Sequence, residues 1–247
     1  MRLSLILLSI LFVWADCHAL TLSDIRTEIR TEINDNPTDT GRRTYTDAVL
    51  LKYINEAQKE IVNLTWLCER ATSYALTGQT TYYALPTDLI AVHQVYFRDS
   101  AGSLTELDEK SQKGLYDTLP DWEKDSGQPL YYWVSSSSNP ASQASAPSFI
   151  SYIPILPRTS TGTATVWYYN QPADLSSDSH TPFENRRNLY SYHLALAYHS
   201  ISRIKQLEGR REESQDYNAR YEKAILILKD RLGRMPNYFG GLGVAPK

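Results

Sequence analysis

The sequence predicts an α+β fold: an antiparallel helix bundle of about four helices, two N-terminal and two C-terminal, with an inserted β-rich region and an extended C-terminal tail. Two observations predict this fold. Apolar residues recur at spacings of three and four before residue 70 and again after residue 184. Between these stretches the period shortens to two, and aromatic and β-branched residues that favour strands become frequent.

Each amphipathic helix must bury its apolar stripe, and the early and late stripes suit one another. We therefore expect the helices at the two ends of the chain to close one bundle. The expected organisation is a signal-like apolar segment (1–19), a first half of the bundle (20–70), an inserted β-rich region (71–183), a second half of the bundle (184–232) and an extended tail (233–247).

The N-terminal segment, residues 1–19, has the features of a secretory signal peptide. Met1-Arg2 precedes a short apolar run, and the small residue Ala19 follows it. The run is too short for a good transmembrane helix. Cleavage after Ala19 would remove Cys17, and the mature chain would then have no second cysteine for a disulfide with Cys68. Two other interpretations stay open: a hydrophobic helix retained in an assembled particle, or a start codon chosen too far upstream.

Two amphipathic helices are expected before residue 70. The first is capped by Thr21, with Asp24 three residues on as in a capping box. The second begins at Thr46 or Asp47, after a polar loop over residues 37–44. The expected buried stripes are Leu22, Ile25, Ile29 and Ile33 in the first helix, and Leu50, Ile54, Ala57, Ile61, Leu64 and Cys68 in the second.

The sequence pattern in the middle of the chain predicts several short strands. Residues 73–76 and 81–85 predict two strands around a turn that contains Gly78. Further strands are expected at 91–97, at 130–134 paired with 149–153, and at 163–169, with a short helix at 111–116 and an exposed loop at 135–148.

The closing helices are expected to be interrupted by Gly209 and ended by Gly233. The expected apolar positions are Leu189, His193, Leu194, Leu196, Ala197, Ser200, Ile201 and Ile204 in the first, and Tyr217, Tyr221, Ile225, Leu228 and Leu232 in the second. The tail after them is expected to lack regular structure.

Composition and motifs argue against several classes of protein. The net charge is −3, with −2 in residues 1–70, −6 in 71–183 and +5 in 184–247, whereas a nucleic-acid reader would show a concentrated basic face. No nucleotide-binding, nucleophile-elbow or zinc-protease motif is present. His193 and His199 lie on different faces of one helix, so we assign them to packing or surface roles. We expect no enzymatic activity, no cofactor and no metal.

Several local patterns, taken in order, resemble the head-to-tail adaptor, or connector, proteins of tailed phages and gene transfer agents. Residues 45–61 resemble the second helix of that family, and residues 74–86 (YALTGQTTYYALP) resemble its Gly-Gln … Tyr-x-Leu-Pro hairpin. The segments GQPLYYW at 127–133, IPILP at 153–157 and VWYY at 166–169 then follow in the family's order. The resemblance covers about residues 20–232.

The resemblance implies a structural virion protein, assembled in the host cytoplasm, that forms a homo-oligomeric ring of twelve copies beneath the portal protein. The C-terminal segment, with Arg234, Tyr238 and Phe239, would dock on the portal, although a frayed terminus is the alternative. The β-region would face the tail or a second adaptor (nozzle) protein. Genome DNA would pass through the ring at the virion neck without sequence recognition.

A second hypothesis assigns the chain to another class of protein. If the N-terminal segment is a cleaved signal, the chain is an exported periplasmic or secreted binding protein that uses an aromatic β-surface. The clusters among its 18 tyrosines would supply that surface. A mature start at Leu20 would favour export, whereas a neighbouring portal or capsid gene would favour the adaptor.

Overall fold

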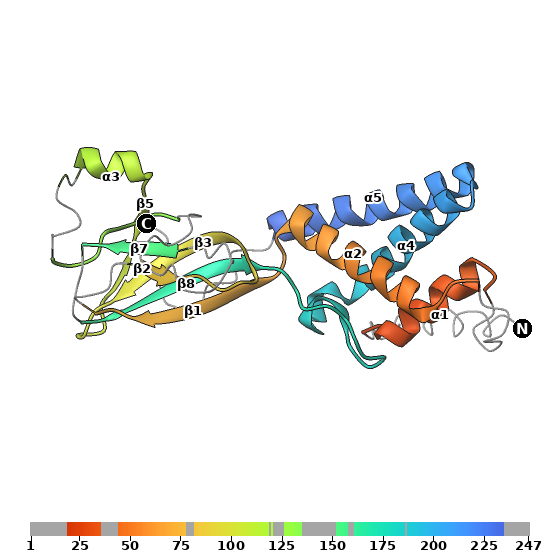
Figure 1. Cartoon of the computed structure of the whole chain (residues 1–247), viewed down its shortest axis with the longest axis horizontal. Helices are drawn as coiled ribbons and strands as arrows, with labels where there is room; N and C mark the ends of the chain where they lie inside the picture. The colour runs from red at the N-terminus through yellow and green to blue at the C-terminus, as the bar shows by residue number, and fades with distance from the viewer. Residues whose placement is uncertain are drawn as a thin grey trace, which may run out of the picture. The chain divides into compact units, whose positions relative to one another are not determined.

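The computed structural model divides the chain into two compact units. The helical unit comprises residues 1–65 and 172–247, and the β unit comprises residues 66–171 (Figure 1). The structure describes residues 19–35, 44–77, 82–118, 120, 126–134, 152–157, 161–185 and 187–234. The predicted α+β class is confirmed. The signal-like segment up to residue 18 and the loop at 135–148 lie outside the described residues.

Helix α1 (Leu22–Glu32) begins as the sequence predicts. The Thr21 side chain accepts a hydrogen bond from the Asp24 backbone N–H, and the Asp24 carboxylate accepts one from the Thr21 backbone N–H at 2.8 Å. This reciprocal pair satisfies two N–H groups that the first helical turn leaves free. Leu22, Ile25 and Ile29 are buried, which confirms the predicted stripe.

Helix α2 (Asp47–Thr65) is preceded by Thr46, whose Oγ1 accepts the Val49 N–H at 3.3 Å. Most of the predicted stripe is buried, but its last two positions are wrong as helix core. Leu64 is 46% exposed. It lies in the final turn of α2, where the apolar stripe continues but no other described element packs over this side chain. Cys68 is buried beyond the end of the helix, since Trp66 adopts a positive φ of 52° and breaks the helical period.

The C-terminal half of the helical unit contains two short 3₁₀ segments, η2 (Pro182–Asn185) and η3 (Arg187–Tyr192), then helices α4 (His193–Leu207) and α5 (Arg211–Arg234). Gly209, at φ +76°, separates the two helices as predicted. The predicted stop at Gly233 is wrong, because α5 continues through Arg234. A single glycine weakens a helix without necessarily ending it.

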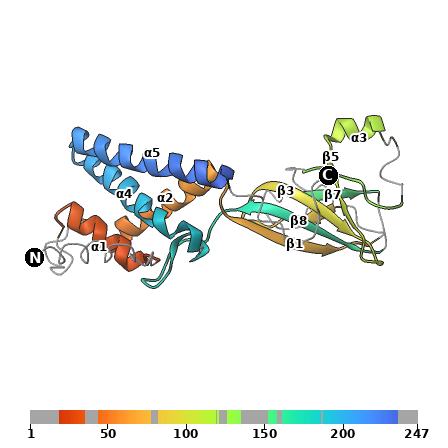
Figure 2. The same ribbon diagram turned by 180° about the vertical axis from the view of Figure 1, so that it is seen from behind.

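Helix α4 is the central element of the helical unit. It contacts α1, α2 and α5, and both views show it running beside α5 (Figures 1 and 2). Most of its length is buried, including Ala195, Leu196, Ile201 and Ile204. The early and late helices therefore share one core, while the antiparallel four-helix bundle itself stays a prediction.

Two amides on α2 hold the segment that returns from the β unit. The Asn55 side chain accepts the Leu175 N–H at 2.8 Å and donates to the Leu175 carbonyl at 3.1 Å. Gln58 donates to the Ala173 carbonyl at 3.1 Å and accepts the Phe183 N–H at 3.0 Å. These residues lie three apart on α2, so their side chains share one face. Their bonds satisfy backbone groups that no regular structure pairs.

The β unit consists of two four-stranded sheets, with strand orders β1-β8-β3-β4 and β2-β7-β6-β5. Its elements are β1 (Glu69–Ala75), β2 (Tyr82–Ala84), β3 (Leu89–Arg98), β4 (Leu104–Glu106), β5 (Asp108–Glu109), α3 (Gln112–Thr118), β6 (Tyr131–Tyr132), β7 (Tyr152–Leu156) and β8 (Thr163–Asn170). Helix α3 confirms the expected short helix.

The predicted pairing within the β unit is partly wrong. The segments at 73–76 and 81–85 do not pair with each other: β1 pairs with β8, and β2 pairs with β7 in the other sheet. Local turn chemistry favoured a hairpin, but the long alternating strand β8 is the better partner for β1. The expected pairing of the segment at 130–134 with the strand that follows the loop is confirmed for β6 and β7, but its register is wrong: Tyr131 lies opposite Leu156 and Tyr132 opposite Ile155, both beyond the expected 149–153.

Residues of both sheets contribute to one apolar core. Along β8 the alternate residues Ala164, Val166 and Tyr168 are buried. Of these, Ala164 and Val166 belong to the shared core together with Leu76, Leu85, Val95, Phe97, Leu107, Tyr132, Ile153 and Ile155. Gly162, just before β8, has φ +115°, and a Cβ there would lie 2.4 Å from the Phe97 ring. Glycine is therefore required at this turn.

Candidate functional site

The predicted portal-docking residues lie at or beyond the end of α5. Arg234 is the last residue of that helix, and Tyr238 and Phe239 lie outside the described residues. Within the described ranges, no group of three or more His, Cys, Asp or Glu side chains is arranged to hold a metal ion. Within the same ranges, no helix combines the length and apolarity that crossing a membrane requires.

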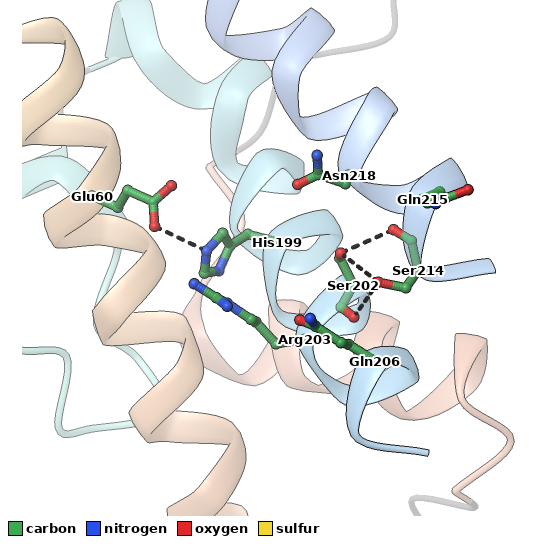
Figure 3. Close-up of a pocket in the computed structure, with 8 residues that line it drawn as sticks. All are labelled: Glu60, His199, Ser202, Arg203, Gln206, Ser214, Gln215 and Asn218. Atoms are coloured by element: carbon green, nitrogen blue, oxygen red, sulfur yellow. Dashed lines mark hydrogen bonds and ion pairs between the residues drawn. The ribbon is translucent and has the colours of Figure 1, made fainter. Parts of the chain in front are cut away.

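A hydrogen-bonded polar cluster joins three helices of the helical unit, and Figure 3 shows two of its members, Glu60 and His199. Glu60 of α2 accepts from His199 of α4, with Nε2 and Oε2 3.1 Å apart, and from the Tyr221 hydroxyl of α5 at 3.0 Å. The His199 and Tyr221 rings meet edge to face, with centroids 5.1 Å apart. Both ring-bearing residues are buried. One carboxylate thereby ties α2 to both α4 and α5.

Burial sets the protonation states in this cluster. It lowers the pKa of His199 from 6.5, and the neighbouring Glu60 carboxylate only partly opposes that shift. Burial and the same carboxylate both raise the pKa of Tyr221. Near neutral pH, His199 is therefore uncharged and Tyr221 keeps its proton. The cluster works as a neutral donor pair on one carboxylate, which suits a structural tie between helices.

A polar pocket of about 320 Å³ opens beside this cluster. Its lining residues are Glu60, His199, Ser202, Arg203, Gln206, Ser214, Gln215 and Asn218, and Figure 3 shows them arranged on α2, α4 and α5. The Ser202 and Ser214 hydroxyls each donate to the other residue's backbone carbonyl, at 2.9 Å and 3.0 Å, and their oxygens lie 3.2 Å apart. These bonds fix the spacing of α4 and α5 along one wall.

Two buried cations, Arg30 and Lys205, form ion pairs that join elements of the helical unit. The Arg30 side chain is 2% exposed, pairs with Asp35, and reaches Asp47 at 2.6 Å and the Tyr45 carbonyl at 3.0 Å. It thereby joins the end of α1 to the start of α2. Between α4 and α5, Lys205 Nζ lies 3.2 Å from Glu213 Oε2, and this ion pair links the two helices.

Two further tyrosine–glutamate bonds tie the late helices to the early ones. The Tyr217 hydroxyl of α5 donates to Glu32 at the end of α1, and Tyr45 donates to Glu208 at 3.2 Å. Burial, with Glu32 beside the hydroxyl, raises the pKa of Tyr217 to about 12. Both phenols are therefore hydrogen-bond donors at physiological pH.

Each unit also presents apolar groups to solvent. On α5, the consecutive residues Leu226 and Ile227 are 70% and 49% exposed. In the β unit, Tyr169 packs against Trp66 at 5.3 Å and stacks on His93 at 5.2 Å between ring centroids. Strand alternation turns Tyr169 away from the core, because Tyr168 on one side of it is buried. In this aromatic group Trp66 is 52% exposed, whereas Tyr169 and His93 are half-buried. Exposed apolar side chains such as Leu226, Ile227 and Trp66 suit protein contacts.

Sequence reasoning identified parts of this arrangement but not the cluster itself. It assigned His193 and His199 to packing or surface roles, and both are buried within the helical unit. It did not connect Glu60 with His199 and Tyr221, which lie 139 and 161 residues further along the chain. No local signal in a single sequence pairs residues at that distance.

The chain is similar to one known protein family. The sequence model of one family, described as SU10 adaptor protein, matches residues 20–241 and so spans both units. No curated protein sequence matches the chain. The match supports a virion neck location and an oligomeric assembly with portal and tail proteins, and gives no support to an exported binding protein. The chain belongs to the SU10 adaptor protein family, the structural head-to-tail adaptors of bacteriophage virions.

Proposed function

We propose that this protein forms a ring of twelve copies beneath the portal, joins the capsid to the tail and surrounds the DNA exit channel. The family match over residues 20–241 carries the proposal, because it covers the helical unit and the β unit together. A ring needs a heterologous interface that closes after a fixed number of copies. The ties among α1, α2, α4 and α5 would keep each copy rigid enough for that closure.

The exposed pair Leu226 and Ile227 on α5 supports a contact with a neighbouring copy in the ring. Two consecutive exposed aliphatic residues on a long helix are costly in solution and favourable at an interface. Replacing both by aspartate should prevent ring formation while leaving the helical circular dichroism of the isolated chain unchanged. Rings that form as before would remove α5 from the proposed interface.

The end of α5 and the tail after it form the proposed portal anchor, with Arg234, Tyr238 and Phe239 as its docking residues. Tyr238 and Phe239 stand next to glycines and follow a proline, so this segment has little helix propensity of its own. The aromatic pair would bury apolar surface on the portal, and Arg234 would add a charged hydrogen bond.

The β unit is the proposed contact with the tail or with a second adaptor (nozzle) protein. Its aromatic group consists of an exposed Trp66 and the half-buried Tyr169 and His93, and exposed aromatic side chains are frequent at interface hot spots. DNA would pass through the channel without sequence recognition. The charge of −6 over residues 71–183 would disfavour lasting phosphate contacts wherever those residues line the channel. Assembly would take place in the host cytoplasm.

Binding to the cognate portal tests this proposal. The purified full chain is mixed with portal rings and analysed by light scattering and negative-stain microscopy, with a stable complex that carries a second ring as the expected result. Tyr238→Ala with Phe239→Ala should weaken binding, and Leu242→Ala in the same tail is the matched control. A wild-type chain that fails to bind the cognate portal would refute the function.

A further inference from the structure

Strand β1 is an edge strand, and no strand among the residues that the structure describes pairs with its outer side. It ends the sheet with the order β1-β8-β3-β4, and it pairs with β8 in a regular antiparallel register over all 7 of its residues (Figures 1 and 2). The other edge strands of the two sheets, β2, β4 and β5, have only 3, 3 and 2 residues. Strand β1 is therefore the longest open edge in the described part of the β unit.

The hydrogen bonds beside β1 show which of its backbone groups are unused. The Asn170 N–H donates to the Cys68 carbonyl at 2.9 Å, and the Leu76 N–H donates to the Gly162 carbonyl at 3.0 Å. Bonded residues alternate along an antiparallel pair, so the even-numbered residues of β1 face β8. The N–H and C=O groups that point away from β8 include those of three exposed residues with small side chains: Ala71, Ser73 and Ala75.

The features that usually protect an edge strand are missing from this stretch. Natural sheets protect their edges with proline, lysine, bulges or inward-pointing charges. Residues 71–75 contain no proline, no glycine and no charged residue. Their register against β8 has no shift, whereas β3 shows register shifts against the same strand. Unpaired backbone groups on a long and regular edge are a template for one more strand from another chain.

One part of this chain has the composition of such a strand. Between β6 and β7, residues 134–151 carry no charged side chain, and the segment 141–146 (ASQASA) stands between Pro140 and Pro147. In extended conformation this segment spans about 20 Å, which covers the edge from residue 71 to residue 75. Its mostly small side chains let two backbones approach to the sheet spacing of about 4.8 Å. Each proline lacks an N–H and would end the pairing at its own position.

We propose that residues 141–146 of one copy add a strand to the outer edge of β1 in the neighbouring copy of the ring. This inference rests on the proposed function, because the ring holds a second copy nearby and raises its effective concentration. The shorter of the two arms that join the added strand to its own sheet, residues 147–151, reaches about 17 Å when extended. Both partners, 71–75 and 141–146, lack charge, so neither repels the other and neither calls for a charged partner.

Cross-linking of thiols in the portal-bound ring tests the pairing. Ala75→Cys is combined with Gln143→Cys or with Ala144→Cys, which cover both faces of the added strand, in a Cys17→Ser background; Cys68 is buried. Residues opposite one another on paired strands have Cβ atoms about 4.5–5.5 Å apart. A short bismaleimide should therefore link neighbouring copies into a ladder of covalent oligomers on a denaturing gel. Ala75→Cys with Ser100→Cys, an exposed turn residue, is the matched control and should give no ladder.

Proline at the edge gives a second test. The Ser73 N–H points away from β8, so Ser73→Pro keeps the hydrogen bonds between β1 and β8 but removes a donor from the added strand. It should lower the yield of linked copies at least about tenfold. Glu106→Pro is the matched control on the edge strand β4, where the Leu107 N–H bonds to the Val95 carbonyl and the Glu106 N–H points outward. Tryptophan fluorescence of the isolated chain checks the fold; if Ser73→Pro loosens the β unit, Ser73→Lys replaces it.

The possible results separate this inference from the proposed function. Portal-bound rings whose copies do not link, or equal losses in Ser73→Pro and Glu106→Pro, would overturn the strand addition and leave the ring in place. Links within one chain, which keep the mass of a single copy, would overturn it as well. A chain that does not bind the portal refutes the proposed function, and the strand addition between copies is then refuted with it.

Discussion

Acidification should destabilise the helical unit through His193, the first residue of α4. Its side chain is fully buried, and Nδ1 lies 3.1 Å from both the backbone nitrogen and the backbone oxygen of Leu20. Within the described residues, Nε2 has no hydrogen-bond partner. The neutral ring is tolerated there, but a second proton would place a charge in an apolar setting beside Phe183 and Tyr190.

The magnitude follows from the difference in pKa between the folded and unfolded chain. Burial lowers the pKa of His193 from 6.5 to about 4, although the backbone of Leu20 partly opposes the shift. The unfolded chain then binds the proton first, so the stabilising contribution is present above about pH 6.5 and is lost as the pH falls. The loss amounts to about 2 kcal/mol between about pH 7 and about pH 5, and to about 3 kcal/mol below about pH 4.

The assay is urea unfolding followed by far-ultraviolet circular dichroism at several pH values. Helices α1, α2, α4 and α5 all lie in the helical unit, so the helical signal reports mainly on that unit. The comparison variant is His193→Asn, which keeps an oxygen near the position of Nδ1 but does not titrate. The wild type should lose about 2 kcal/mol more than this variant between about pH 7 and about pH 5.

The control is His180→Gln, which changes an exposed histidine of the same unit and should leave the wild-type pH dependence in place. Subtracting the variant removes the contribution of His199, whose lowered pKa acts in the same direction. If the wild type and His193→Asn lose stability in parallel as the pH falls, burial of His193 does not control the acid response and the reasoning is refuted.

Three further substitutions have expected outcomes. Arg30→Met should lower the free energy of unfolding of the helical unit by about 3–5 kcal/mol, because Asp35 then stays buried without a counter-charge; a change as small as that of an exposed arginine would contradict the ion-pair argument. Tyr221→Phe should cost about 1 kcal/mol in the same urea assay, since it removes one hydrogen bond to Glu60, and no change would mean that water replaces the phenol. Gly162→Ala should destabilise the β unit by about 1–3 kcal/mol through its positive φ and its clash with a core ring. Tryptophan fluorescence measures this last effect, and Gly127→Ala, where a Cβ meets no atom within 4 Å, is its control.

Local signals explain why the helices could be predicted. The Thr21–Asp24 capping box and the break at Gly209 depend on hydrogen bonds and dihedral angles within a few residues. The apolar stripes report which face is buried, but they do not report how far the covering element extends. Leu64 shows this limit: it continues the stripe of α2 and is nevertheless exposed.

Most contacts of the candidate site could not be predicted from a single sequence. His199 could be assigned to a packed helix face. Its neighbours Glu60 and Tyr221 belong to α2, before the β unit in the chain, and to α5, after it, so only folding brings them together. The pocket depends on the spacing of α4 and α5, which the Ser202–Ser214 bonds help to set. The docking assignment of Arg234, Tyr238 and Phe239 rested on the family resemblance and stays a prediction.

The sequence by itself determined the α+β class, the capped start of α1, the glycine break before α5 and the order of family-like segments, because each depends on local periodicity or on short-range hydrogen bonds. Only the tertiary structure decided that β1 pairs with β8 rather than β2, that Asn55 and Gln58 hold the returning chain, and that one glutamate joins three helices. These contacts bring together residues far apart in the chain, and their selection depends on the burial of whole surfaces, which no local pattern encodes.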